Sequence, residues 1–169
     1  WIRVCSSQAP APAATSVTWP VSTLDESILL VYPQRMSGGA LPYRDFFAAY
    51  GPTHWWGLHG WFSVVGLTIE SLRVLGLLLH VALALGVLVL LRAYGRGVAL
   101  TASALTVLLL FRLGAAPYAW LTTTVLCVWA LAIARRRPLW AGVLAGLAIG
   151  VRPDVALLDI ELPGMSGLD

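Results

Sequence analysis

Ionisable side chains concentrate in one part of the sequence, between Asp25 and Pro52. This stretch carries three carboxylates and two guanidinium groups, which belong to Asp25, Glu26, Arg35, Arg44 and Asp45. Carboxylates can take a proton from a hydroxyl group, and guanidinium groups bind phosphate oxygens through pairs of hydrogen bonds. A long and nearly charge-free region follows, so we expect the chemistry of the protein to sit at the mouth of a membrane domain.

The composition of the chain is that of a membrane protein. Of its 169 residues, 59% are hydrophobic and 11% are charged, and the mean hydropathy is +0.81. These values lie outside the range of soluble globular domains. The formal charge of +3 comes from eleven arginines against eight acids, since the chain has no lysine. The arginines are dispersed between apolar segments, which argues against nucleic acid as a partner and makes them indicators of orientation in the bilayer.

Four apolar segments follow the polar stretch, at residues 74–91, 97–111, 113–134 and 138–151. As a helix, the first would rise about 27 Å, close to the ~30 Å thickness of the hydrocarbon core. The second and fourth are shorter and need flanking residues or a locally thinner bilayer. The predicted fold is all-α and integral to the membrane: an antiparallel bundle of about four transmembrane helices, preceded by a polar outer loop with short helices and followed by a short tail outside the membrane.

This fold divides the chain into four parts. Residues 1–23 are rich in Ala, Pro and Ser and are expected to be a disordered or extended leader. Residues 24–70 form the outer loop and an interfacial segment whose tryptophans suit the headgroup level of a membrane. Residues 71–152 hold the transmembrane helices, and residues 153–169 form the tail.

Two features of the outer loop bear on its fold. A short helix is expected to begin near Asp25, whose carboxylate serves either as a functional group or as a helix N-cap, and the Ser-Gly-Gly sequence at 37–39 should end it. His54 and His59 are five residues apart, so they do not share a helical face as a metal-binding pair would. Interfacial hydrogen bonding is the simpler interpretation of both histidines.

The arginines orient the predicted spans. Arg92 and Arg96 lie in one connection, and the three consecutive arginines at 135–137 lie in the connection two spans later. Both connections belong on the cytoplasmic side. The outer loop is therefore expected on the non-cytoplasmic face.

Small residues inside the apolar segments are expected to serve packing. In the last segment, glycines recur every four residues and create a face for close helix approach; they are Gly142, Gly146 and Gly150. The three threonines at 122–124 can donate to carbonyl groups of their own helix and need no further role.

The outer loop contains a set of residues at characteristic spacings. An Asp-Glu pair is followed by an aromatic residue, an arginine, a glycine, a Pro-Tyr-Arg-Asp-Phe run and a Tyr-Gly-Pro triplet: Asp25, Glu26, Tyr32, Arg35, Gly39, 42–46 and 50–52. This set resembles the first outer loop of the multi-pass glycosyltransferases that use polyprenyl-phosphate sugars, the group with the protein O-mannosyl and aminoarabinose transferases. With the apolar segments, the resemblance covers about residues 24–152.

The resemblance implies an activity and a set of roles. The protein would transfer a hexosyl or pentosyl group from a polyprenyl-phosphate donor to an acceptor, on the non-cytoplasmic face of the bacterial inner membrane. The implied catalytic residues are Asp25, as the base, and Glu26, as a supporting or metal-contacting carboxylate. The implied substrate-binding residues are Arg35, Tyr43, Arg44 and Asp45.

By the same resemblance, Arg44 is part of a clamp on the lipid phosphate, and Asp45 orients it through an ion pair. The alternative is that the pair only holds the loop together. A divalent cation at Glu26 is the one cofactor left open, and the partners are the lipid-linked donor and the membrane lipids. A transporter-like module, with the polar loop as a gate, is a different functional interpretation.

The tail carries a second resemblance. In residues 153–169 a short apolar run ends in Asp159, and a proline and two glycines follow it. This pattern resembles the phospho-acceptor segment of response-regulator receiver domains, which implies Asp159 as the acceptor in a phosphorelay. The magnesium-holding acids and the lysine of a receiver are missing, so we expect a chimeric join at Arg152 to Asp154; the alternative is a genuine fusion of a response regulator to a membrane protein. Residues 1–23 cannot supply the spanning helix that the glycosyltransferases carry before the loop, so the chain is expected to be a fragment that is inactive by itself.

Overall fold

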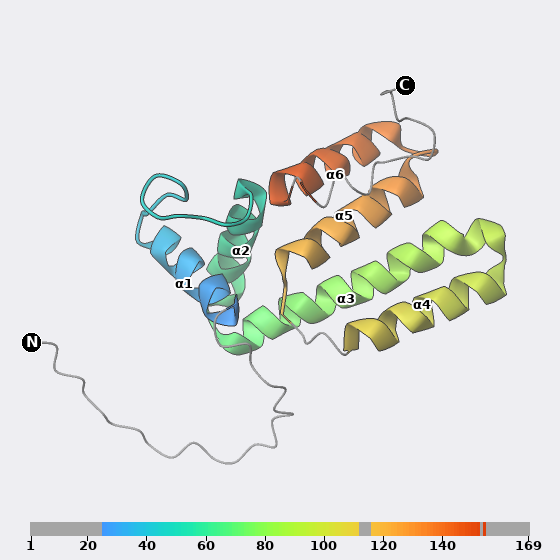
Figure 1. Cartoon of the computed structure of the whole chain (residues 1–169), viewed down its shortest axis with the longest axis horizontal. Coiled ribbons are helices and arrows are strands. Elements are labelled where there is room, and N and C mark those ends of the chain that lie inside the picture. Colours follow the sequence, from blue (N-terminus) through green and yellow to red (C-terminus); the bar gives the residue numbers. More distant parts are fainter. Residues whose placement is uncertain (1–24, 112–115, 153, 155–169) are drawn as a thin grey trace, which may run out of the picture.

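The computed structural model describes residues 25–111, 116–152 and 154 (Figure 1). These residues form helices joined by short loops, with an isolated β-bridge between Pro42 and Phe46. The elements are α1 (Asp25–Ser37), α2 (Pro52–Val65), α3 (Ile69–Leu91), the 3-10 helix η1 (Arg92–Tyr94), α4 (Arg96–Phe111), α5 (Ala119–Ile133) and α6 (Pro138–Val151). The predicted all-α fold is confirmed for this part of the chain. The predicted leader and nearly all of the predicted tail lie outside the described residues.

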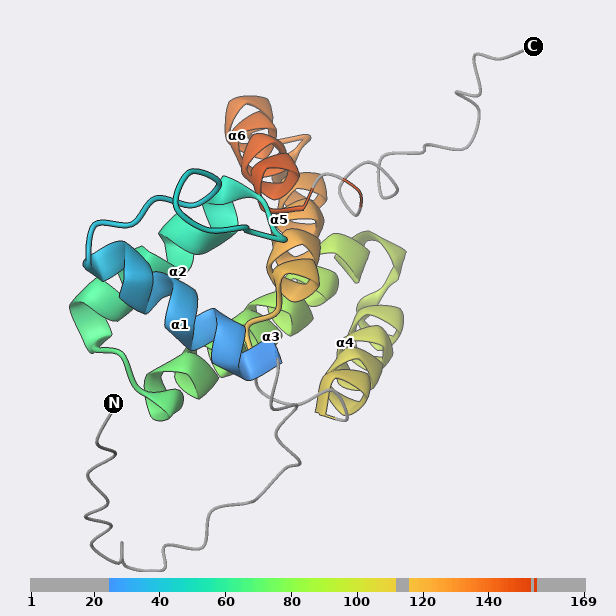
Figure 2. The same cartoon turned by 60° about the vertical axis from the view of Figure 1, so that its left-hand side comes forward.

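The longest helix, α3, is the axis of the arrangement (Figure 1; Figure 2). Helices α4 and α5 both pack on α3, and α6 packs on α5. Helix α1 packs on α2 near the N-terminal end of α3, and α2 also contacts α6. We call α3–α6 the helical body, and α1, the loop at 38–51 and α2 the outer unit. The outer unit therefore lies at one end of the helical body.

Each of the four predicted apolar segments forms a helix, but in the described residues one helix alone is long and apolar enough to cross a membrane. It is α3 with its 3-10 extension, Ile69–Tyr94, which has 26 residues and a mean hydropathy of 2.8 over its most apolar window. The shorter apolar helices Arg96–Leu110, Ala119–Ile133 and Pro138–Val151 rise only about 21 to 23 Å, less than the ~30 Å of a hydrocarbon core. Length and composition support membrane association through one helix, and a bundle of about four spans stays a prediction.

The third apolar segment forms a shorter helix than its sequence indicates. We predict a span over 113–134, whereas α5 begins at Ala119. Pro117 disfavours helical backbone in the residue before it, and Tyr118 is extended as the N-cap, with φ −60° and ψ 148°. Residues 112–115 lie outside the described part. The proline therefore sets the start of the helix.

Helix α3 begins and ends at defined turns. The Thr68 hydroxyl oxygen accepts a hydrogen bond from the Ser71 N–H at 3.1 Å, which caps the helix, and Glu70 suits the positive end of its dipole. After η1, Gly95 has a φ of +108°, a backbone conformation that glycine adopts readily. This turn sends the chain back into α4, which makes α3 and α4 antiparallel neighbours.

Polar side chains and a glycine hold α4 and α5 close to α3. The Ser103 hydroxyl donates to the Ala84 carbonyl oxygen, and the Trp129 indole N–H donates to the Ala82 carbonyl oxygen, both at 2.9 Å. At Gly86, an added Cβ would come within 2.8 Å of a valine side chain on α5. Small residues and interhelical hydrogen bonds are the usual means of helix packing where no water is present. These contacts hold α4 and α5 against the middle of α3.

The packing face predicted on α6 is used at one glycine. An added Cβ would meet nothing within 4 Å at Gly142 or Gly146, whereas at Gly150 it would lie 2.3 Å from the Thr53 hydroxyl oxygen. In the described part of the chain the predicted face is not used at the first two glycines: both are exposed, whereas Ala141 and Ala148 of α6 are buried. The threonines at 122–124 do donate to carbonyl groups of their own helix, as predicted.

The start of α2 meets the end of α6 at backbone distance (Figure 1). The Gly51 N–H donates to the Val151 carbonyl oxygen at 2.8 Å. A Cβ added at Gly51 would lie 2.0 Å from the Gly150 carbonyl oxygen, so no side chain fits there. This glycine contact joins the outer unit to the helical body.

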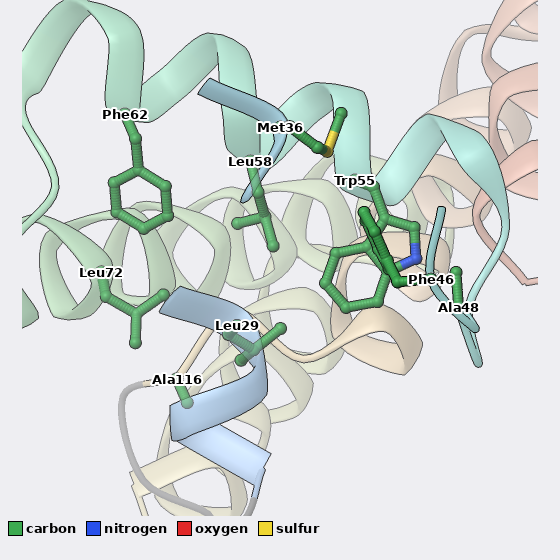
Figure 3. Close-up of a cluster of buried hydrophobic side chains, with 9 residues drawn as sticks. All are labelled: Leu29, Met36, Phe46, Ala48, Trp55, Leu58, Phe62, Leu72 and Ala116. Atoms are coloured by element: carbon green, nitrogen blue, oxygen red, sulfur yellow. The ribbon is translucent and has the colours of Figure 1, made fainter. Parts of the chain in front are cut away.

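A hydrophobic cluster lies between the outer unit and the start of the helical body. The buried members of the cluster are Leu29, Met36, Phe46, Ala48, Trp55, Leu58, Phe62, Leu72 and Ala116 (Figure 3). They come from α1, the loop, α2, the first turn of α3 and the segment before α5. Trp55 is completely buried, and burial of a large apolar side chain stabilises a fold by about 1.5 to 3 kcal/mol. The cluster therefore gives the loop a rigid base.

We expect Gly150→Ala to destabilise the contact between α2 and α6, because the new methyl group meets the Thr53 hydroxyl. Overpacking of this kind costs about 1 to 3 kcal/mol, which should lower the thermal midpoint of the purified protein in detergent. Gly146→Ala is the matched control: its Cβ enters open space, so the midpoint should stay or rise. Adding Thr53→Ala to Gly150→Ala should recover part of the loss. Equal effects of the two glycine substitutions would contradict the contact.

Candidate functional site

Three of the candidate site residues, Tyr43, Arg44 and Asp45, lie on the loop at 38–51. Gly39, with φ +90°, follows the end of α1, as the Ser-Gly-Gly sequence predicts. The Tyr43 N–H then donates to the Phe46 carbonyl oxygen at 3.0 Å, which closes a tight turn. Tyr43 has a φ of +66°, a conformation that residues other than glycine seldom adopt and that is found disproportionately at functional sites. The turn leaves the side chains of residues 43–45 exposed.

Arg44 and Asp45 form a two-pronged ion pair on this turn. Arg44 donates from Nε to Oδ1 at 3.0 Å and from Nη2 to Oδ2 at 2.9 Å. Asp45 Oδ2 also accepts from the Leu41 N–H at 2.7 Å. The hydrogen bond from Arg44, followed by the one from Leu41, lowers the pKa of Asp45, and the hydrogen bond to Asp45 raises the pKa of Arg44. The predicted orientation of Arg44 by Asp45 is therefore present, and the same contacts also brace the loop.

Tyr43 and Trp55 tie the two arms of the loop together. The hydroxyl of Tyr43 and the indole N–H of Trp55 both donate to the carbonyl oxygen of Tyr50, the latter at 3.0 Å. Burial raises the pKa of Tyr43, so its phenol remains a hydrogen-bond donor at neutral pH. The Tyr43 side chain is still 55% exposed, which leaves one face of the ring accessible from outside.

A cluster of aromatic side chains packs against the turn at 42–46. The Tyr32 ring is 4.7 Å from Phe46 and 4.8 Å from Trp55, between ring centroids, and Tyr50 stacks on Trp55 at 5.8 Å. The Arg35 guanidinium lies 5.9 Å from the centre of the Phe46 ring, within range of a cation–π contact. Arg35 is thus brought to the same part of the outer unit as the turn at 42–46.

Asp25 and Glu26 belong to the first turn of α1, at the end of the helix away from the loop (Figure 1). Tyr32, which packs on Phe46 of the turn, lies about 10 Å further along the helix axis than Asp25. The structure therefore gathers Arg35, Tyr43 and the Arg44–Asp45 pair at one end of α1 and puts the Asp-Glu pair at the other end.

The described residues bear on a metal site and do not bear on the phospho-acceptor site. In that part of the chain, no group of three or more His, Cys, Asp or Glu side chains is placed to hold a metal ion. A cation held by Glu26 together with ligands from elsewhere stays a prediction. Asp159, the acceptor of the receiver-like segment, lies outside the described residues.

His54 differs from its predicted role at a membrane interface. Its side chain is only 3% exposed, and within the described residues its Nε2 has no hydrogen-bond partner. The ring meets Tyr50 and Trp55 edge to face, at 5.5 and 5.3 Å. Burial lowers the pKa of His54 to about 4 from 6.5. The predicted hydrogen bonding of His54 is wrong because the aromatic cluster encloses the ring, which the sequence alone did not indicate.

Comparison of the chain with protein-family models, with curated proteins and with solved structures finds no match. The class of protein must therefore be inferred from the loop, the apolar helices and their geometry.

We expect His54 to make the protein sensitive to acid. Because the pKa of the folded state lies below the ordinary value, the stabilising effect is complete above pH 6.5 and is lost as the pH falls towards 4. The full loss is about 3 kcal/mol. The measurement is the thermal midpoint between pH 4 and pH 7, in which His54→Phe should flatten the profile. If the profile of His54→Phe runs parallel to that of the unaltered protein, His54 is not the group responsible.

Proposed function

We propose that the chain carries the outer loop and part of the membrane helices of a bacterial glycosyltransferase that uses a polyprenyl-phosphate sugar. The observation that supports this most strongly is the exposed Arg44–Asp45 turn, which is held over an aromatic base and joined to apolar helices. A lipid-linked donor carries a phosphate at the membrane surface and a hydrocarbon chain inside the bilayer. Arg44 on the turn can bind the phosphate, and the apolar helices can contact the hydrocarbon chain.

Arg44 has donors to spare for a phosphate. Its hydrogen bonds to Asp45 use Nε and Nη2, and its side chain is 68% exposed. A guanidinium group has five N–H donors in a planar fork, so the remaining ones can bind phosphate oxygens while Asp45 holds the plane in place. Arg35, above the Phe46 ring, adds a second positive charge to the same part of the outer unit.

Asp25 is the better candidate for the base of the two loop aspartates. Asp45 already accepts hydrogen bonds from Arg44 and Leu41, and its pKa is lowered, which makes it a weak proton acceptor. In the proposal, Asp25 deprotonates or orients the acceptor hydroxyl while C1 of the sugar is attacked and the lipid phosphate departs. Glu26 supports Asp25 or contacts a divalent cation.

Asp25 and the turn are separated along α1. The axial rise from Asp25 to Tyr32, which packs on Phe46 of the turn, is about 10 Å. In the proposal the two groups therefore have different roles: the carboxylate acts on the acceptor hydroxyl, and the arginine holds the departing phosphate.

The proposal also includes an orientation: α3 to α6 as about four spans of the inner membrane, with the outer unit on the non-cytoplasmic face. It predicts that a cysteine introduced by Arg136→Cys, with the native cysteines replaced by serine, is protected from impermeant maleimide in intact cells. Ser63→Cys, on the exposed side of α2, is the matched control and should be labelled. Labelling of position 136 from outside would refute this topology.

In membranes that contain a complete homologous chain, we expect Asp25→Asn to lower turnover by roughly 10²- to 10⁴-fold, the range for loss of a positioned general base; the fragment itself should be inactive. Arg44→Lys should mainly raise the KM for the donor, because a point charge replaces a two-pronged contact. The assay follows transfer of labelled sugar from polyprenyl-phosphate mannose or aminoarabinose, with the amount of each variant measured by immunoblot.

Asp45→Asn serves as the comparison for the base. It keeps the shape of the side chain and removes the charge that orients Arg44, so it should act on the KM for the donor as Arg44→Lys does. If Asp25→Asn keeps normal turnover while Asp45→Asn abolishes it, the assignment of the base is wrong and passes to Asp45.

A further inference from the structure

A cavity of about 370 Å³ lies where α3 turns into α4. It is lined by Leu88 of α3, Arg92 of η1, and Arg96, Ala99 and Leu100 of α4. Two cationic side chains and three apolar side chains therefore share one small space. The cavity is at the end of α3 away from the outer unit (Figure 1), so it is separate from the candidate site described above.

The two arginines of the cavity lack an acidic partner among the described residues. The ion pairs in that part of the chain are Arg44–Asp45 and Arg152–Asp154, neither of which involves the cavity. Arg92 and Arg96 are both exposed. A pair of guanidinium groups four residues apart, facing a common space, creates a positive potential that favours an anion with several oxygen atoms.

The surroundings of the cavity are apolar. Leu100, on its wall, is 61% exposed, and the neighbouring faces of α3 and α4 present Leu85 at 48% and Leu108 at 65%. Such side chains are stable in contact with hydrocarbon, and α3 is the helix long enough to cross a membrane. An anion that binds here would therefore have hydrocarbon next to it.

We propose that the cavity binds the phosphate group of an anionic phospholipid, whose acyl chains lie along the exposed faces of α3 and α4. The guanidinium groups of Arg92 and Arg96 hold the phosphate oxygens, and Leu88, Ala99 and Leu100 contact the glycerol and the first methylene groups. A free phosphate would gain the charge contacts and would leave the apolar wall without a partner. The charge and the apolar wall together fit a lipid better than a soluble anion.

This site goes beyond the proposed glycosyltransferase function, because it uses the membrane location of α3 and none of the catalytic residues. The three arginines at 135–137 lie at the same end of the helical body (Figure 1) and add a general attraction to anionic membranes. They do not line the cavity. They therefore provide a control with the same charge at the same end of the molecule.

The test is native mass spectrometry of the purified protein in detergent, supplied with phosphatidylglycerol or phosphatidylcholine. We expect one retained phosphatidylglycerol per chain and little phosphatidylcholine. The double variant Arg92→Gln and Arg96→Gln should lower the bound fraction of phosphatidylglycerol about tenfold or more, as expected when charge-assisted hydrogen bonds are lost. The control double variant Arg135→Gln and Arg136→Gln should stay within about twofold, because a detergent micelle has little surface potential of its own.

A competition experiment with inorganic phosphate distinguishes a lipid from a free anion, and a second measurement checks that each variant is folded. Millimolar inorganic phosphate should not displace the lipid; displacement would assign the cavity to a free anion and overturn the proposal. An equal loss of lipid in the two glutamine variants would reduce the effect to general surface charge and also overturn it. Circular dichroism checks the fold of each variant. If the Arg92 and Arg96 glutamine variant does not fold, the variant with lysine at both positions decides: unchanged retention would argue against a guanidinium site.

Discussion

The backbone hydrogen bond from Gly51 to Val151 is the constraint on which the placement of the loop depends. It joins the first residue before α2 to the last residue of α6, two segments a hundred residues apart in the sequence. The approach is possible because Gly51 and Gly150 have no side chains to hold the backbones apart. Since α6 packs on α5 and α5 packs on α3, this contact connects the outer unit to the far side of the helical body, while the hydrophobic cluster connects it to the start of α3 through Leu72.

In the outer unit, the buried aromatic residues provide stability, and the exposed polar turn holds charged groups at the surface. Tyr32, Phe46 and Trp55 supply buried contact area, while the indole N–H of Trp55 and the hydroxyl of Tyr43 satisfy the Tyr50 carbonyl group at the edge of the cluster. The ion pair of Arg44 and Asp45 is exposed, so solvent screens it and it adds little to stability. Its value is geometric: it fixes the plane of a guanidinium group at the surface.

The charges of the helical body and the outer unit are separated along the molecule. The arginines of the connection between α3 and α4 lie at one end, Arg35 and Arg44 belong to the unit at the other end, and the helices between them expose leucine and valine side chains. Leaving these leucine and valine side chains in water is unfavourable, because moving one methylene group from water to an apolar environment lowers the free energy by about 0.8 kcal/mol. This distribution agrees with membrane association through α3, which in the described residues is the helix long and apolar enough to span a bilayer.

The sequence by itself determined the helical class, the positions of the apolar helices, the end of α1 at its Ser-Gly-Gly sequence and the bonding of the three threonines. Each of these follows from local composition, from glycine and proline geometry, or from contacts within one helix turn. Only the tertiary structure decided that His54 is enclosed, that a side chain at position 150 would meet Thr53 while one at 142 or 146 would meet open space, and that Asp25 and the turn with Arg44 lie towards opposite ends of α1. These facts depend on which distant segments come together, and a local pattern is the same whether its neighbour is another helix, lipid or water.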